Sequence, residues 1–234
     1  MEELKKLVSE NHLLMEKLLK EGRIKVQEVY TDGEELLPEL KASLIDGGLF
    51  NRKSIQHPLV IGNLDLMPNS YYNTQLIRKQ QKLKEFEKNK EFESYLFLIE
   101  KPFRIIFFSE LVKQNKIKRL SKKYWEILSS LWTGSENIFQ YKELWKELFQ
   151  DKTNSHYFMS KKDLEFYNSL ENEFMVYRGY NQWEDGYSYT IDKDVAIWFA
   201  ERFGQNGMIK ERLVKKEDVF AFTNSRKEKE IIII

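Results

Sequence analysis

The feature that most constrains the fold is a change in the character of the chain near Phe174. Before this point, most segments are charged and carry apolar residues at three- and four-residue spacing, which is typical of amphipathic helices. After it, short runs of β-branched and aromatic residues are separated by turn residues, which is typical of strands. Runs of helices followed by runs of strands predict an α+β fold. We therefore expect a mainly helical N-terminal region, residues 1–158, and a compact strand-rich core, residues 159–234.

Several separate helices are expected in the first region. One more helix is expected to begin just after this region with a sequence that resembles a capping box, because Ser160 is followed three residues later by Asp163, which replaces the usual Glu. The segment PLVIGNLDLMP, residues 58–68, is predicted to be a short strand or a buried extended segment. The helices are predicted at residues 3–20, 71–90, 94–115, 121–133 and 139–150.

Five strands and one helix are expected in the second region. The strands are FMVYRG at 174–179, GYSYTID at 186–192, GMIKERLV at 207–214, DVFAF at 218–222 and EIIII at 230–234. The helix is DKDVAIWFAERFG at 192–204, and it ends at a glycine, a residue that commonly follows a helix.

The composition narrows the chemistry that the chain can carry out. There are no cysteines, which excludes disulfides, thiolate metal sites and cysteine nucleophiles. The histidines, His12, His57 and His156, show no metal-ligand spacing, so no metal site is expected. The N-terminus lacks the pattern of a secretory signal, and no apolar run reaches the roughly 20 residues that a membrane helix needs. We expect a cytoplasmic protein that has no membrane partner.

Two basic runs raise the question of a nucleic-acid partner. Residues 113–123, KQNKIKRLSKK, contain six basic residues and no acid, and residues 78–90 are also rich in lysine. Such runs suit nucleic acid or an acidic protein, but they also suit the solvated face of a helix. Neither run has the interleaved aromatic residues typical of single-strand binders, so the solvated face is the favoured interpretation. The net charge of +1 argues neither way.

Polar residues recur on three of the expected strands. Arg178 ends the first strand, and Ser188 and Thr190 share one face of the second because side chains alternate along a strand. Glu228 and Glu230 lead into the last strand. An arginine can hold a phosphate with two parallel hydrogen bonds, and a carboxylate beside a sugar can stabilise an oxocarbenium-like transition state. Together they suit a phosphate-bearing nucleoside that breaks at its glycosidic bond, although each alone also fits an ordinary structural role.

These residues resemble motifs of the ADP-ribosyltransferase family, in the class named for its Arg, Ser and Glu motifs. The motifs here are VYRG, YSYT and EKEII, and the helix AIWFAERF that follows the second motif also fits the family. The resemblance covers about residues 160–234 and extends to small intracellular members encoded by phages and other mobile elements. It implies an ADP-ribosyltransferase-like split β-sheet with NAD, as substrate, in the cleft between its two parts.

The resemblance also implies roles for the residues. Arg178 would hold the phosphates of NAD, and the backbone of Gly179 would clamp the nicotinamide amide. Ser188 would orient Glu230, which would bond the 2′-hydroxyl of the nicotinamide ribose as nicotinamide leaves. Glu228 would orient or deprotonate the acceptor, which in members with Glu-x-Glu is arginine.

Four further residues are candidates around the same pocket. Tyr189, which stands in place of the middle Thr of the family's triplet, and Thr190 would contact NAD. Trp198 and Phe199 could shape the pocket, although helix spacing favours an ordinary core position for Phe199.

The sequence thus predicts a mono-ADP-ribosyltransferase that uses NAD, needs no metal and acts on arginine of a host protein. Three alternatives stay open. The chain could hydrolyse NAD to ADP-ribose, or it could be an inactive member of this fold that binds a nucleotide or a partner. A nucleic-acid-binding module in the helical region could coexist with any of these. The sequence does not specify an oligomeric state.

Overall fold

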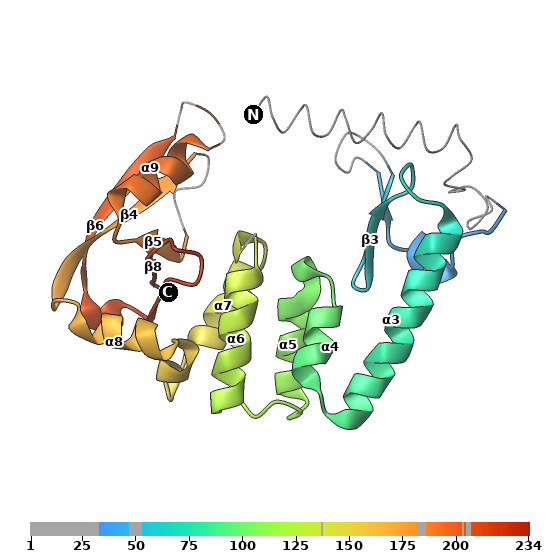
Figure 1. The fold of residues 1–234 in the computed structure, drawn as a ribbon, viewed down its shortest axis with the longest axis horizontal. Helices are drawn as coiled ribbons and strands as arrows, with labels where there is room; N and C mark the ends of the chain where they lie inside the picture. Colours follow the sequence, from blue (N-terminus) through green and yellow to red (C-terminus); the bar gives the residue numbers. More distant parts are fainter. Residues whose placement is uncertain (1–32, 47–52, 137, 182–185, 203, 205–206) are drawn as a thin grey trace, which may run out of the picture. The chain divides into compact units, whose positions relative to one another are not determined.

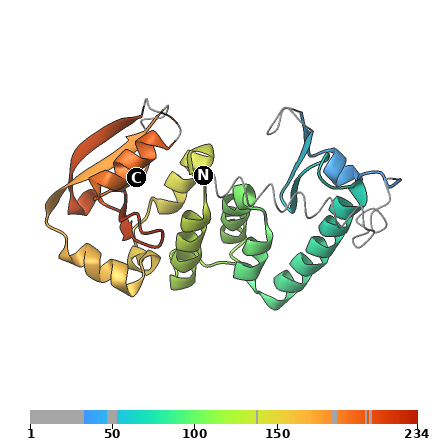
Figure 2. The same ribbon diagram turned by 45° about the horizontal axis from the view of Figure 1, so that its top comes forward.

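The computed structural model describes residues 33–46, 53–136, 138–181, 186–202, 204 and 207–234. The helix predicted for residues 3–20, together with His12, lies outside this part of the chain. The described elements mix helices with antiparallel sheet, so the predicted α+β class is confirmed (Figures 1 and 2). The chain divides into two compact units, Met1–Glu85 and Phe86–Ile234.

The first unit contains a small antiparallel sheet, which lies within the region that the sequence predicts to be mainly helical. The segment PLVIGNLDLMP contains one of its strands, β3, which pairs with β2. The buried side chain of Asn73 accepts a hydrogen bond from Leu37 N at 2.9 Å and donates one to Glu35 O at 2.8 Å, which ties the long helix α3 to the chain before α2. The elements are α2 Pro38–Lys41, β1 Leu44–Ile45, β2 Ser54–His57, β3 Val60–Asn63 and α3 Asn69–Asn89, whose last turn continues into the second unit.

Helices form the first half of the second unit. The prediction of a single helix over residues 94–115 is wrong, because this segment forms two helices with a break around Pro102. The ring of a proline and its missing N–H interrupt a helix. The helix start at Ser160 is confirmed, since Ser160 Oγ accepts from Asp163 N at 3.2 Å. The other half of the capping box differs, because the Asp163 carboxylate accepts from the Ser160 hydroxyl at 2.7 Å and from Asn224 N at 3.1 Å. The elements are α4 Phe92–Leu98, η1 Lys101–Phe103, α5 Arg104–Lys113, α6 Lys122–Gly134, η2 Ile138–Tyr141, α7 Lys142–Phe149, η3 Ser155–Phe158 and α8 Lys161–Ser169.

A five-stranded antiparallel sheet follows, with the strand order β6-β4-β5-β8-β7. Strands β4 and β6 pair along eight residues, whereas β4 and β5 pair only at Tyr177 and Thr190. The sheet therefore falls into two parts, β6–β4 and β5–β8–β7, that are joined at one pair. The elements are β4 Glu173–Tyr180, β5 Ser188–Thr190, α9 Lys193–Glu201, β6 Met208–Lys215, η4 Lys216–Asp218, β7 Ala221–Thr223 and β8 Glu230–Ile232.

The helices and the sheet of the second unit share one aromatic core. The ring of Phe149 lies 4.5 Å from that of Phe220 and 6.5 Å, in a stacked geometry, from that of Trp125, measured between centroids. Ala221 and Ile232, from β7 and β8, are buried in the same cluster. The large area that aromatic rings bury makes this cluster a main stabilising element of the unit.

The boundary between compact units differs in position from the boundary that the sequence predicts between helical and strand-rich regions. The division between compact units falls after residue 85, and the boundary predicted between residues 158 and 159 lies inside the second unit. The sequence shows where the type of element changes, but the aromatic residues of α6 and α7 do not by themselves reveal that strands β7 and β8 cover them.

Helix α9 packs very closely on strand β4 (Figure 1). A Cβ atom at Gly179 would lie 1.9 Å from Ala196 O and 2.6 Å from Ala200 N, which are both backbone atoms of α9. Ala196 and Ala200 are themselves buried and small. The absence of a side chain at Gly179 is therefore what allows the helix to approach the strand.

We expect Gly179→Ala to destabilise the protein by about 1–3 kcal/mol, because α9 must move away from β4. The measurement is the free energy of unfolding from urea denaturation. Gly134→Ala is the matched control, because it adds the same methyl group at the end of α6 with no atom within 4 Å. Helix propensity predicts that this control is neutral or slightly stabilising. Equal stability of the two variants would contradict the packing argument.

Candidate active site

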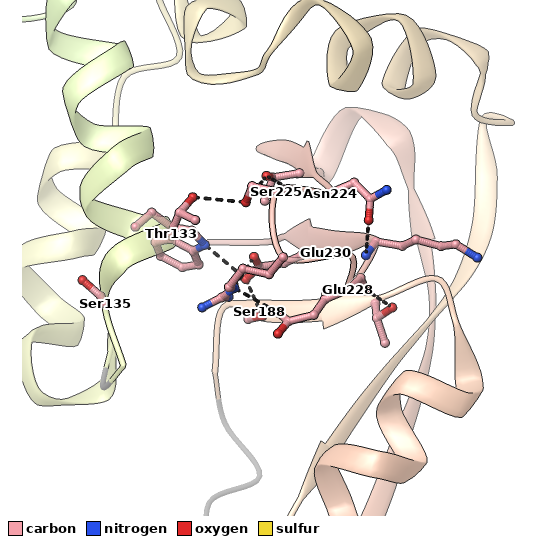
Figure 3. A network of polar contacts seen from close by, with 12 residues as sticks. Thr133, Ser135, Ser188, Asn224, Ser225, Glu228 and Glu230 are labelled. Carbon is pink, nitrogen blue, oxygen red and sulfur yellow. Dashed lines mark hydrogen bonds and ion pairs between the residues drawn. The ribbon is translucent and has the colours of Figure 1, made fainter.

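A buried carboxylate, that of Glu230, lies at the start of β8, the middle strand of the three-stranded part of the sheet. Only 3% of this residue is exposed. Its Oε1 accepts hydrogen bonds from Ser188 Oγ at 2.6 Å and from Trp132 Nε1 at 3.1 Å, and its Oε2 accepts one from Arg226 Nη2 at 3.2 Å (Figure 3). A buried charge is costly unless it is paired and hydrogen-bonded, and these three donors meet that requirement.

Strand pairing brings Ser188 and Glu230 together. Glu230 is paired with Thr190 of β5, and Ser188 is paired with Ile232, so the serine lies diagonally across from the carboxylate on the same face. The two side chains are in contact, as the sequence suggests, through a hydrogen bond of 2.6 Å.

Glu228 lies beside the buried carboxylate and is linked to it through Arg226. Arg226 Nε is 3.1 Å from Glu228 Oε2, while its Nη2 contacts Glu230, so one guanidinium spans both glutamates. Burial raises the pKa of the Glu228 carboxyl, and Glu230 acts in the same direction, whereas Arg226 and Arg202 oppose the rise. The side chain of Glu228 remains one-quarter exposed, which leaves it open to an incoming group.

The turn that carries these charges is held by polar contacts. Lys227 and Lys229 adopt positive φ values of 62° and 45°, and Asn224 Oδ1 accepts from Lys229 N at 3.1 Å. Thr190 Oγ1 donates to Glu228 O at 2.7 Å and accepts from Asp192 N at 3.0 Å. The Thr190 hydroxyl is thus engaged in anchoring the turn, and its contact with NAD stays a prediction.

Arg178 lies where β4 and β5 separate. Its Nη1 donates to the backbone oxygen of Ser188 at 2.8 Å, and a Cβ atom at Gly186 would lie 2.4 Å from its guanidinium carbon. The arginine therefore binds the backbone of the residue whose hydroxyl holds Glu230. The chain of contacts Arg178–Ser188–Glu230 connects all three motifs that the sequence singles out.

Gly179 and Tyr189 lie in different surroundings from these residues. Gly179 lies against the backbone of α9, so close packing already explains why a glycine stands there. Tyr189 is 7% exposed and belongs to a second apolar cluster with Val176 and Ile231, on the face opposite to Ser188 and Thr190. Their predicted contacts with NAD are untested.

A hollow of about 670 Å³ opens on the Tyr189 side of β5. Gly186, which contacts Arg178, is one of its lining residues. The charge of the hollow is mixed, because Lys142, Lys152 and Arg212 line it together with Glu217 and Asp218. Its volume is within the range of small-molecule pockets. Neither Glu230 nor Ser188 lines it, so the hollow and the buried carboxylate are separate features on the two faces of the strand.

The end of α9 contributes aromatic residues near Glu228. Trp198 is 60% exposed, and Phe199, which the sequence favours as an ordinary core residue, is only partly buried. The guanidinium of Arg202 lies 4.8 Å from the centre of the Phe199 ring and 5.8 Å from that of Trp198. The charge of Arg202 also acts on the pKa of Glu228, which places this group close to the site.

Sequence reasoning missed two of the three donors to Glu230. Arg226 carried a local signal, because it precedes Glu228 by the same two residues that separate Glu228 from Glu230. Trp132 carried none, because it is 98 residues away from Glu230 in the sequence.

Some cations of the basic run 113–123 contact groups of the chain itself. Lys113 is 3.2 Å from Glu110, and Lys122 is 3.7 Å from Glu126. Arg119 Nη2 donates to the backbone oxygen of Glu147 at 3.0 Å. These pairs agree with a solvated helix surface more than with a continuous anionic-ligand site.

No family model matches the chain, and neither a curated protein nor a solved structure similar to it was found. Within the described ranges, no cluster of three or more His, Cys, Asp or Glu side chains could hold a metal ion. In the same part of the chain, no helix is both long and apolar enough to span a membrane.

The raised pKa of Glu228 predicts a specific pH dependence of stability. The folded chain binds this proton more tightly than the unfolded chain, in which the pKa of the carboxyl is near 4.5. The contribution of Glu228 to the free energy of unfolding therefore falls as the pH rises from the unfolded pKa through the higher folded pKa. The melting temperature of Glu228→Gln minus that of the wild type should therefore increase from about pH 4 to about pH 7. Glu165→Gln, on the exposed side of α8, is the control. A constant difference for Glu228→Gln across this range would contradict the shift.

Proposed function

We propose that the chain is a mono-ADP-ribosyltransferase that transfers ADP-ribose from NAD to arginine of a protein acceptor and releases nicotinamide. The observation that carries the proposal is the contact of Ser188 Oγ with Glu230 at 2.6 Å, together with Arg178 bound to the Ser188 backbone. A hydroxyl-held carboxylate with a cation close by is the arrangement that cleavage of a phosphate-bearing nucleoside at its glycosidic bond requires.

The residues present fit NAD as substrate. Arg178 would hold the phosphates, and it lies against Gly186, one of the residues that line the 670 Å³ hollow. When bound, NAD supplies the ADP-ribosyl group and a nicotinamide leaving group. The carboxylate of Glu230 accepts the hydrogen bond of the ribose 2′-hydroxyl and stabilises the positive charge that develops on the sugar.

The two oxygens of Glu230 have different surroundings, which assigns them different tasks. Oε1 is held by Ser188 and Trp132, whose donors are neutral and buried or partly buried. Oε2 contacts Arg226, whose side chain is 36% exposed and shared with Glu228. Oε2 is therefore the oxygen that a substrate hydroxyl can reach, after Arg226 moves away.

Glu228 suits the acceptor half of the reaction. The pKa of its carboxyl is raised toward neutral pH, and a carboxylate with such a pKa is a better general base. The guanidinium of Arg226 already lies across Glu228 and Glu230, which supports a guanidinium group as the acceptor. We propose that the acceptor belongs to a protein of a host cell and that nucleic acid is not the partner.

One observation favours a second candidate, a non-catalytic module of this fold that binds a nucleotide or a partner. Glu230 is 3% exposed and its oxygens already have three donors, so the described state is closed to a substrate. Binding of NAD without release of nicotinamide would favour this candidate over the transferase.

Glu230→Gln should lower the rate of nicotinamide release from NAD by about 100-fold or more, because the charge that stabilises the transition state is lost. The measurement is free nicotinamide released from labelled NAD, with thermal unfolding to verify that the variant is folded. The control Glu165→Gln removes one exposed carboxylate and should match the wild type. An unchanged rate in Glu230→Gln would rule out the proposed role.

Glu228→Gln should lose transfer to arginine more strongly than it loses release of nicotinamide to water, because its carboxylate serves the acceptor. The measurement is the ratio of labelled agmatine, a small arginine analogue, to total nicotinamide released. Glu230→Gln is the comparison, since it should reduce both quantities together. Equal loss of both quantities in Glu228→Gln would assign Glu228 to sugar cleavage or to structure instead. Nicotinamide release by the wild type without any labelled acceptor would indicate NAD hydrolysis.

A further inference from the structure

Helix α6 supplies a hydrogen-bond donor to the candidate catalytic carboxylate. Trp132 is 1% exposed, and its Nε1 donates to Glu230 Oε1 at 3.1 Å. We propose that Trp132 is a positioning residue that holds the Glu230 carboxylate in the orientation that the reaction needs. This inference rests on the proposed function, because it assigns Trp132 a part in the same site.

The indole of Trp132 is rigidly held. Its ring packs edge to face on Trp145, with centroids 5.2 Å apart and an angle of 87°, and on Phe149, at 5.4 Å and 70°. Helix α6 itself begins at a capped end, where Ser121 Oγ accepts from Tyr124 N at 3.2 Å. A donor that cannot move restricts the positions that its acceptor can occupy, so the position of the indole N–H determines where Glu230 Oε1 lies.

The chemistry of an indole suits this task. The Nε1–H group can only donate, so the oxygen that it contacts must act as an acceptor. Ser188, by contrast, has a hydroxyl that can rotate and can also accept a hydrogen bond. The two donors together fix Oε1, and they leave Oε2 as the oxygen that exchanges Arg226 for substrate.

The charged groups around Glu230 are few in the described part of the chain. Arg226 contacts Oε2, and Glu228 interacts with Glu230 electrostatically from the same turn. The donors from β5 and α6, Ser188 and Trp132, are neutral. A change at Trp132 therefore alters the hydrogen bonding of Glu230 without removing a neighbouring charge.

The kinetic test compares Trp132→Phe with Trp145→Phe in the full-length chain. Both variants replace a buried indole of one cluster by a phenyl ring, but only the first removes the donor to Glu230. Trp132→Phe should lower kcat for nicotinamide release by about 10- to 100-fold with little change in KM for NAD, as expected for loss of a hydrogen bond to a charged group. Trp145→Phe should not show this loss of kcat.

A second measurement needs no turnover. The chain has five tryptophans, so its indole N–H signals can be followed by ¹H–¹⁵N NMR, and the signal missing in Trp132→Phe identifies Trp132. Glu230→Gln and Ser188→Ala should each shift this signal more than the other indole signals. A Trp132 signal that neither substitution moves would overturn the inference.

The outcomes separate the two proposals. If the wild type releases nicotinamide and Trp132→Phe matches Trp145→Phe in kcat, the positioning role is overturned and the proposed function stands. If the wild type releases no nicotinamide, the proposed function fails and the positioning role fails with it. A lower kcat with little change in KM in Trp132→Phe alone, with the NMR response, supports both.

Discussion

The burial of one negative charge, the Glu230 carboxylate, is the constraint on which the rest of the second unit depends. Removing an ionised carboxylate from water costs several kcal/mol unless donors replace the lost hydration. Here the donors come from strand β5, from helix α6 and from the turn before β8. These parts of the chain must be in place together for the charge to be tolerated. The helices are thus not an appendage to the sheet, because one of them satisfies its buried charge.

The sheet is organised around the same residue. Its two parts are joined only at the Tyr177–Thr190 pair, and Arg178 lies immediately beyond that pair. On one face of β5, Ser188 holds Glu230, and on the other, Tyr189 borders the hollow whose margin contacts Arg178. A substrate that engages both Arg178 and Glu230 has to use the separation between β4 and β5. In the proposed reaction, such a substrate displaces Arg226 from Oε2; Arg226 also contacts a second carboxylate, that of Glu228.

Much of this could be predicted from local pattern. Strand alternation places Ser188 and Thr190 on one face, and the box at Ser160 and Asp163 begins α8 where the pattern predicts. The break at Pro102 was overlooked, although the ring of a proline is a local signal that sequence reasoning can use. The sheet of β1, β2 and β3 was only partly anticipated, since its strands have two to four residues and are too short to show a period.

The sequence by itself determined the α+β class and most of the helices and strands, because these follow from short-range periodicity. It also suggested Arg178, Ser188 and Glu230 as one group, through the chemistry of their side chains and the resemblance of their motifs to those of a known family. Only the tertiary structure decided which side chains complete that group. Trp132 reaches Glu230 from 98 residues away, since α6 shares an aromatic core with β7 and β8. It also decided that Gly179 serves the approach of α9 and that Tyr189 faces away from Ser188. Contacts of this kind depend on which faces pack together, and no local pattern of residues specifies that.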